Sequence, residues 1–198
     1  MFQYTLLLVD YDTFCQHSIT SDVDEECDIA VARHMSSSHA DFDSIINNAI
    51  EHLPYVKSLR DEQKICLKNL VEGKDVFAIL PTGFGKSLIF QLFPRIMSIV
   101  KETVGVSVQT IIVVTPLVAI MKDQVEQLKR IAIKATAIGF GTEEGMDEHA
   151  AKCGECEIVY GSPESWLSKE WRTELQSGQL GKNVVAIAID KVHSITEW

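Results

Sequence analysis

The residue types best suited to chemistry lie in the stretch LPTGFGKSLIFQ, residues 80–91. Gly83 and Gly85 allow the backbone to come close to a ligand, so that loop N–H groups and the amino end of a following helix can point at a phosphate. The ammonium of Lys86 would then reach the terminal phosphates of a nucleotide, and the Ser87 hydroxyl would coordinate magnesium. The stretch therefore predicts a nucleotide-phosphate site. The alternative is a flexible turn that happens to precede a helix.

A second candidate group lies near the carboxyl end, where the apolar run VVAIAI, residues 184–189, leads to Asp190. An aspartate at the end of a buried strand can hold a magnesium ion beside a nucleotide. Hydrolysis also needs a neighbouring carboxylate that orients or deprotonates the attacking water, but the next residue is Lys191. An ammonium is a hydrogen-bond donor only and keeps its proton at neutral pH. We therefore expect nucleotide binding to survive and hydrolysis to fall by a factor of about 10²–10⁴.

These residues need a sheet to position them. Short apolar runs predict buried strands at residues 76–80, 110–115, 135–138, 157–160 and 184–189. Helical patterns occupy residues 61–72, 86–93, 117–131 and 162–171. The first stops before Gly73, and Pro94 ends or kinks the second. The last begins with Ser162 as N-cap and Pro163 at N1. Strands that alternate with helices predict an α/β fold with a mostly parallel sheet and helices on both faces.

The negative charge of the chain is concentrated at its amino end. The formal net charge is −10, and residues 1–50 contain nine acidic residues against Arg33 alone, so that residues 51–198 are nearly neutral. The whole-chain charge therefore does not exclude a nucleic-acid partner. Residues 1–50 have no sustained helical or strand period. We expect them to form an irregular acidic extension, poorly ordered or loosely packed, in front of one domain at 51–198.

Cysteine usage and hydropathy bear on the surroundings of the protein. Five cysteines, an odd number, are scattered through a chain large enough to fold without disulfides, which favours a reducing, intracellular setting. The sequence shows no basic amino-terminal leader and no apolar stretch that approaches the ~18 residues of a membrane span. We expect a soluble protein with no membrane partner, in the nucleus if its source is eukaryotic.

Five segments resemble, in order, motifs of the RecQ-type ATP-dependent DNA helicases of superfamily 2, over about residues 56–198. They are LRDEQ at 59–63, LPTGFGKSLIFQ at 80–91, VVTPLVAIMKDQVEQL at 113–128, YGSPESWL at 160–167 and IDKVHSITEW at 189–198. The resemblance implies the first RecA-like lobe of a helicase, truncated at its carboxyl end. It also implies ATP and Mg²⁺ as ligands, DNA as the partner, either single-stranded or at a duplex junction, and 3′ to 5′ translocation.

The resemblance also assigns roles to single residues. Arg60 would flank the adenine and Gln63 would read its edge. The phosphates would be held by Pro81, Thr82, Gly83, Phe84, Gly85, Lys86 and Ser87. Magnesium would be held by Ser87 together with Asp190. His193 would couple the nucleotide state to the DNA-side motifs, whereas Lys191 occupies the general-base position and is predicted to be non-functional there.

The residues that the resemblance places on DNA are Thr115, Pro116, Leu117, Lys122, Ser162 and Pro163. Those at 115–117 and 162–163 follow predicted strands, at the end of an α/β sheet where loops gather ligands and helix N-termini can accept phosphates. On spacing alone, the segment around Lys122 is an ordinary solvated helix face, so its DNA contact depends on the resemblance.

Two smaller signals have competing interpretations. His149, Cys153 and Cys156 offer three zinc ligands, but there is neither a second Cys-x-x-C pair nor an evident fourth ligand, which favours two reduced thiols. Trp166 and Trp171 lie in an amphipathic segment, where core packing is favoured over stacking on bases.

Three hypotheses for the function follow. The first is a truncated RecQ-like helicase, with weak or no activity alone because an arginine from a second lobe would complete the family's active site. The second is a catalytically inactive module that binds DNA or protein when it holds a nucleotide. The third is a degenerate fragment without an independent role. The sequence does not indicate an oligomeric state.

Overall fold

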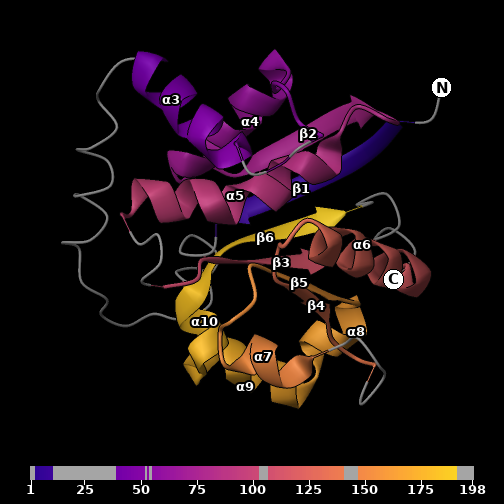
Figure 1. Ribbon diagram of the computed structural model, residues 1–198. Helices are drawn as coiled ribbons and strands as arrows, with labels where there is room; N and C mark the ends of the chain where they lie inside the picture. The colour runs from indigo at the N-terminus through magenta and orange to yellow at the C-terminus, as the bar shows by residue number, and fades with distance from the viewer. Residues whose placement is uncertain are drawn as a thin grey trace.

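The computed structural model describes residues 3–10, 39–51, 53, 55–102, 107–140 and 147–190. In this part of the chain six strands form one sheet in the order β2-β1-β6-β3-β5-β4, with helices on both faces (Figure 1). The strands are β1 (Gln3–Asp10), β2 (Val76–Pro81), β3 (Thr110–Val114), β4 (Ala135–Ala137), β5 (Ile158–Gly161) and β6 (Val184–Asp190). The predicted α/β fold is confirmed.

The helices of the described residues are divided between the two faces of the sheet. One face is covered by α3 (His39–Ile50), α4 (Asp61–Val71), α5 (Lys86–Val100) and α6 (Val118–Arg130), around Ile111 and Val113 of β3. The other is covered by α7 (Glu148–Lys152), α8 (Pro163–Leu167), α9 (Lys169–Ser177) and α10 (Gln179–Asn183), around Ile112. None of these helices is long and apolar enough to cross a membrane, within the ranges that the structure describes.

Four of the strands are parallel neighbours, in the order β6, β3, β5 and β4. All five predicted strands agree with the observed ones to within one residue at each end. For the parallel strands the reason is burial: every residue of β5 is buried, and so are four of the five in β3. β2 was also predicted to be buried, but only its Ala78 is, so that part of the prediction was wrong. A strand covered on both faces is apolar throughout, so its pattern can be recognised from the sequence alone.

The amino-terminal segment differs from the irregular extension that we predicted, at least in its described parts. Residues 3–10 form β1, which lies between β2 and β6 and is antiparallel to both. Residues 39–50 form α3, whose Ile46 and Ala49 are buried in the main core. The intervening residues 11–38 lie outside the described residues. The sequence did not predict β1 because its pairing depends on strands that lie 66 or more residues further along the chain.

Two helix predictions also need correction. Of the two outcomes predicted at Pro94, an end or a kink, the structure excludes the end, because α5 continues to Val100. Proline removes one helical hydrogen bond, but the side chains of Ile96 and Met97 beyond it are buried in the core and compensate for that loss. The single helix predicted over residues 162–171 is two helices, because Ser168 ends α8 and begins α9 as its N-cap. The predicted stop of α4 before Gly73 is confirmed, with Gly73 at φ 71°.

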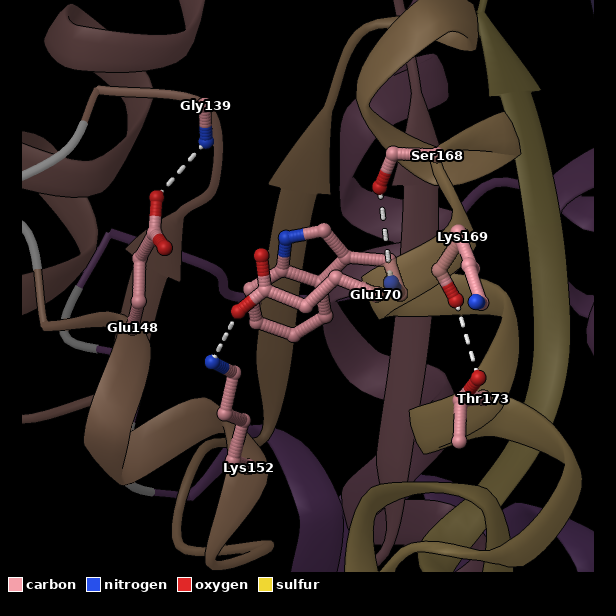
Figure 2. A network of polar contacts seen from close by, with 8 residues as sticks. Gly139, Glu148, Lys152, Ser168, Lys169, Glu170 and Thr173 are labelled. Carbon is pink, nitrogen blue, oxygen red and sulfur yellow. Dashed lines mark hydrogen bonds and ion pairs between the residues drawn. The ribbon is translucent and has the colours of Figure 1, made fainter.

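Polar contacts connect the elements on the α7 to α10 side (Figure 2). Lys152 of α7 forms an ion pair with Glu170 of α9. The backbone N–H of Gly139 donates to Glu148 Oε1 over 2.8 Å, which connects the end of β4 to α7. These pairs are exposed and contribute little to stability individually. They lie on the opposite face of the sheet from α5, whose amino end carries the phosphate loop.

Candidate nucleotide-binding site

The predicted phosphate loop connects the end of β2 to the start of α5. Gly83 and Gly85 have φ values of 77° and 81°, in the left-handed region that other residues avoid, and Gly85 is the N-cap of α5. A Cβ atom placed on Gly83 would meet no atom within 4 Å, so the backbone here faces open space. The strand, turn and helix therefore have the arrangement in which a helix N-terminus accepts a phosphate.

Gln63 of α4 holds this loop in place. Its Nε2 donates to the carbonyl oxygens of Phe84 (3.1 Å) and Gly85 (3.0 Å), and its Oε1 accepts from the backbone N–H of Arg60 (2.9 Å). A Cβ atom on Gly85 would lie 2.7 Å from Gln63 Nε2, so a larger residue does not fit. Because both ends of the amide are engaged and the side chain is only 3% exposed, its visible role is to position the loop. Its contact with adenine stays a prediction.

A pocket of about 840 Å³ opens beside the loop. Arg60 lies on its wall with its guanidinium carbon 4.3 Å from the centroid of the Phe84 ring. The other lining residues are Tyr55, Val56, Lys57, Ser58, Gln63, Gly83, Phe84, Gly85, Ser87, Leu88, Gln91, Gln124, Gln127, Leu128, Arg130 and Ile131. A volume of this size suits a nucleotide-sized ligand.

Lys86 is the first residue of α5, and its side chain folds back on the end of β2. Its Nζ donates to the carbonyl oxygens of Leu80 (3.0 Å) and Pro81 (2.9 Å). Partial burial lowers the pKa of Lys86, and the nearby charge of Asp190 opposes that shift. The register explains their proximity: Asp190 pairs with Leu6 of β1, and Leu6 pairs on its other side with Ala78 of β2. Lys86 and Asp190 therefore lie close enough to interact electrostatically, and the role predicted for them at a nucleotide stays a prediction.

Comparison with known proteins agrees with this geometry. The sequence profile of the DEAD/DEAH box helicase family matches residues 60–198, which include Arg60, the phosphate loop and Asp190. The chain belongs to this family. A DEAD/DEAH box helicase domain implies that ATP is bound, so the nucleotide site and the family agree.

Individual relatives are distant and much longer. ATP-dependent helicase SGS1 of Saccharomyces cerevisiae is 33% identical over 70% of this chain and 10% of its own length. ATP-dependent helicase wrn-1 of Caenorhabditis elegans is 30% identical over 76% of this chain and 13% of its own length. ATP-dependent DNA helicase Q1 of Pongo abelii is 27% identical over 77% of this chain and 23% of its own length. The predicted RecQ kinship is confirmed at this distance. The chain spans about a tenth to a quarter of the length of these relatives.

The residues predicted to contact DNA in this helicase domain lie at the carboxyl ends of β3 and β5. The N–H of Thr115 donates to the carbonyl of Gly161 over 3.1 Å, which joins the two strand ends. Ser162 is the N-cap of α8 and accepts from the N–H of Ser165, with Pro163 at N1. The hydroxyl of Thr115 is buried and has no hydrogen-bond partner among the described residues.

The remaining predicted DNA contacts begin α6. Leu117 is the exposed N-cap of α6 and follows a half-buried Pro116. Lys122 is exposed, with its Nζ 4.9 Å from the centroid of the Phe140 ring. The contact of these residues with DNA stays a prediction. Lys191 and His193 lie outside the described residues, so the roles predicted for them stay predictions.

The structure also describes the two tryptophans and the three candidate zinc ligands. Trp166 and Trp171 are both buried, with ring centroids 5.7 Å apart in an edge-to-face arrangement, so core packing is confirmed. His149 Nε2 lies 3.6 Å from Cys153 Sγ, whereas Cys156 is buried, and burial raises its pKa to about 11. No three candidate ligands in the described ranges are arranged to hold a metal ion.

The sequence analysis did not predict that α6 would form a wall of the nucleotide pocket. Gln124, Gln127, Leu128 and Ile131 recur at spacings of three and four residues, which places them on neighbouring parts of one helix surface. That spacing was available in the sequence. What it lacked was the packing of α6 beside α5, which turns this surface toward the phosphate loop.

Proposed function

We propose that this chain is the ATP-binding lobe of a RecQ-like 3′ to 5′ DNA helicase, which binds ATP with Mg²⁺, contacts DNA at the carboxyl ends of β3 and β5, and hydrolyses ATP poorly. The observation that carries the proposal is the phosphate loop, with two left-handed glycines at the start of α5 and a nucleotide-sized pocket beside it. The kinship with the longer ATP-dependent DNA helicase Q1 supports DNA as the partner.

The residues around the loop fit a magnesium nucleotide. The hydroxyl of Ser87 and the carboxylate of Asp190 are the hard oxygen donors that Mg²⁺ prefers. In this site Mg²⁺ would neutralise phosphate charge. The Lys86 ammonium would exchange its two carbonyl partners, Leu80 and Pro81, for phosphate oxygens, which carry a full charge and form stronger hydrogen bonds.

Poor hydrolysis follows from Lys191. The residue next to Asp190 would have to accept a proton from the attacking water, and an ammonium cannot accept one. This also supports a second candidate function, a catalytically inactive module whose DNA or protein contacts depend on bound nucleotide. Such a module would share the nucleotide site but would not turn over when DNA is added.

Calorimetric titration of the 198-residue chain with Mg-ATP tests the binding step. We expect Lys86→Ala to weaken binding at least about 30-fold, because it removes a charged hydrogen-bond donor. Lys182→Ala, an exposed lysine on α10, serves as the matched control and should bind like the wild type. Failure of the wild-type chain to bind Mg-ATP would refute the proposal.

A phosphate-release assay with and without single-stranded DNA tests the hydrolysis step. We expect slow release in both conditions. Fast, DNA-stimulated release that Lys86→Ala abolishes would refute impaired hydrolysis. Lys191→Glu should increase release if the remaining catalytic groups are present in this chain, and no increase would favour the inactive binding module.

A further inference from the structure

Two glutamines connect the nucleotide pocket to the interior of the protein. Gln91 on α5 and Gln124 on α6 both line the pocket, and Gln91 Nε2 donates to Gln124 Oε1 over 3.2 Å. Because Gln124 Oε1 accepts this bond, the Nε2 group of Gln124 is the end of the amide that can donate to a ligand. The α6 side of the pocket thus carries an oriented hydrogen-bond donor.

Behind Gln91 lies a buried tyrosine. Tyr160 of β5 is 2% exposed, and its ring packs edge-to-face on Phe90, with centroids 6.4 Å apart. Within the described residues its hydroxyl makes no hydrogen bond of standard geometry. Burial raises the pKa of Tyr160 well above its usual value, while the side chain of Gln91 is close enough to oppose that shift. Gln91 can oppose that shift only as a donor to the tyrosine oxygen, and its Nε2 already donates to Gln124. A hydrogen bond from the Tyr160 hydroxyl to Gln91 Oε1 would therefore form only after the two side chains adjust.

Tyr160 stands directly before the strand end where the predicted DNA contacts lie. Its neighbour Gly161 accepts the hydrogen bond from Thr115, and Ser162 follows as the N-cap of α8. An unpaired buried hydroxyl is unfavourable, so a partner that fixes Gln91 also fixes Tyr160. Gln124 and Gln91 are thus hydrogen-bonded to each other at the pocket, and Tyr160 lies in β5 without a hydrogen bond to Gln91 in this arrangement.

We infer that Gln124 donates an N–H hydrogen bond to an acceptor on the base or ribose of the bound nucleotide, and that Gln91 and Tyr160 hold it in this orientation. Gln124 is thereby a nucleotide-contacting residue, and Gln91 and Tyr160 are positioning residues. The inference rests on the proposed function, since it names a further contact in the same ATP site. It predicts that removal of the Tyr160 hydroxyl changes nucleotide affinity although this hydroxyl touches no ligand.

The first test measures Mg-ATP affinity of Gln124 variants by calorimetric titration. Gln124→Leu should weaken binding about fivefold, the usual value of one hydrogen bond. Gln124→Glu keeps the shape but offers acceptors only, so it should weaken binding at least as much. Affinity unchanged in Gln124→Glu would overturn the inference. The matched control is Gln179→Leu, because Gln179 also bonds a side-chain amide, Asn183 Oδ1, at 3.2 Å but lies on α10.

The second test is a double-mutant cycle with Tyr160→Phe, which keeps the ring that packs on Phe90. Tyr160→Phe alone should weaken Mg-ATP binding about twofold to threefold, and it should have no further effect in Gln124→Leu. If the effects of Tyr160→Phe and Gln124→Leu on affinity add, or if Tyr160→Phe has no effect, Tyr160 does not position Gln124. Thermal unfolding of each variant shows whether a loss of affinity reflects loss of fold.

The two proposals fail in different ways. If the wild-type chain binds no Mg-ATP, the proposed function is wrong and this inference with it. If the wild-type chain and Gln179→Leu bind equally well and the Gln124 variants match them, only the present inference is wrong.

Discussion

The sheet has two regions that are built differently. The parallel region comprises β6, β3, β5 and β4, and its strands are covered on both faces, by α5 and α6 on one and by α7 to α10 on the other. The phosphate-loop region comprises β1, β2, the loop that follows β2, and α4, which packs on both strands. Within the described residues β2 is an edge strand, and it pairs there only with the antiparallel β1. Phe77 and Ile79 on one face of β2 remain 58% and 53% exposed.

The difference indicates where the molecule is rigid and where it can respond to a ligand. The strands of the parallel region are supported by neighbours and by both helical layers, so their positions are fixed by packing. β2 carries the loop that would meet the phosphates, but among the residues that the structure describes it has one neighbouring strand and one covered face. Regions of low local stability commonly contain the parts that move on ligand binding. The following predictions test this comparison, from the largest effect to the smallest.

The largest effect should come from the centre of the parallel region. Ile111→Ala removes a fully buried side chain of β3 and should lower the free energy of unfolding by about 4 kcal/mol, because it leaves a cavity between the sheet and the helices. Urea unfolding measures the change. The matched control is Ile65→Ala on α4, which is exposed and should cost less than about 1 kcal/mol. Equal costs would contradict the assignment of this core.

A proline in β1 should uncouple the two regions. Leu7 pairs with Phe77 of β2 and with Ile189 of β6, and Leu7→Pro removes its N–H group from this ladder. We expect a loss of about 3 kcal/mol. Hydrogen exchange should accelerate in β2 more than in β3, and Mg-ATP should bind more weakly. Leu7→Val, which keeps the N–H group, is the control. Equal acceleration in both strands would show that the sheet opens as one unit.

Two buried cysteines report on local opening, one in each region. In a background with serine at the other three cysteines, Cys66 of α4 should be alkylated several-fold faster than Cys156 beside β5. Burial raises the pKa of both thiols, to about 11 for Cys156, so both react through opening. The rates are measured by mass spectrometry at pH 8. Faster reaction of Cys156 would reverse the proposed order of stability.

The Cys156 thiol should also make the free energy of unfolding depend on pH. The unfolded chain releases the Cys156 proton near its ordinary pKa of 9.0, whereas the folded chain keeps it up to about 11. The unfolded state therefore binds fewer protons between these values, and stability should fall as the pH rises through this window. In Cys156→Ser this part of the fall should disappear, as urea unfolding at pH 8 and pH 10.5 can measure.

The smallest effect should come from the uncovered face of β2. Ile79→Thr should change the free energy of unfolding by less than about 0.5 kcal/mol, because the side chain is half exposed and threonine favours strands equally. Ile112→Thr, the same change at a buried position of β3, should cost several-fold more. A large cost at Ile79 would show that this face is covered by something that the described residues do not include.

Much of the candidate site could be predicted from local sequence. The glycines and Lys86 needed only their own spacing, since the loop folds on residues adjacent in the chain. Gln63 lies beside the loop, but its two bonds to the loop carbonyls could not be predicted because they join residues 21 and 22 positions apart. The α6 wall, including Gln124, likewise depends on how two helices pack.

The sequence by itself determined the parallel strands, the left-handed glycines and the kinship, because each is encoded by neighbouring residues: a run buried on both faces, a turn, a motif. Only the tertiary structure decided that β1 enters the sheet between β2 and β6, that α5 continues through Pro94, and that Lys86 and Asp190 lie close together. These outcomes depend on free energies of packing and pairing between distant segments, which a local pattern does not contain.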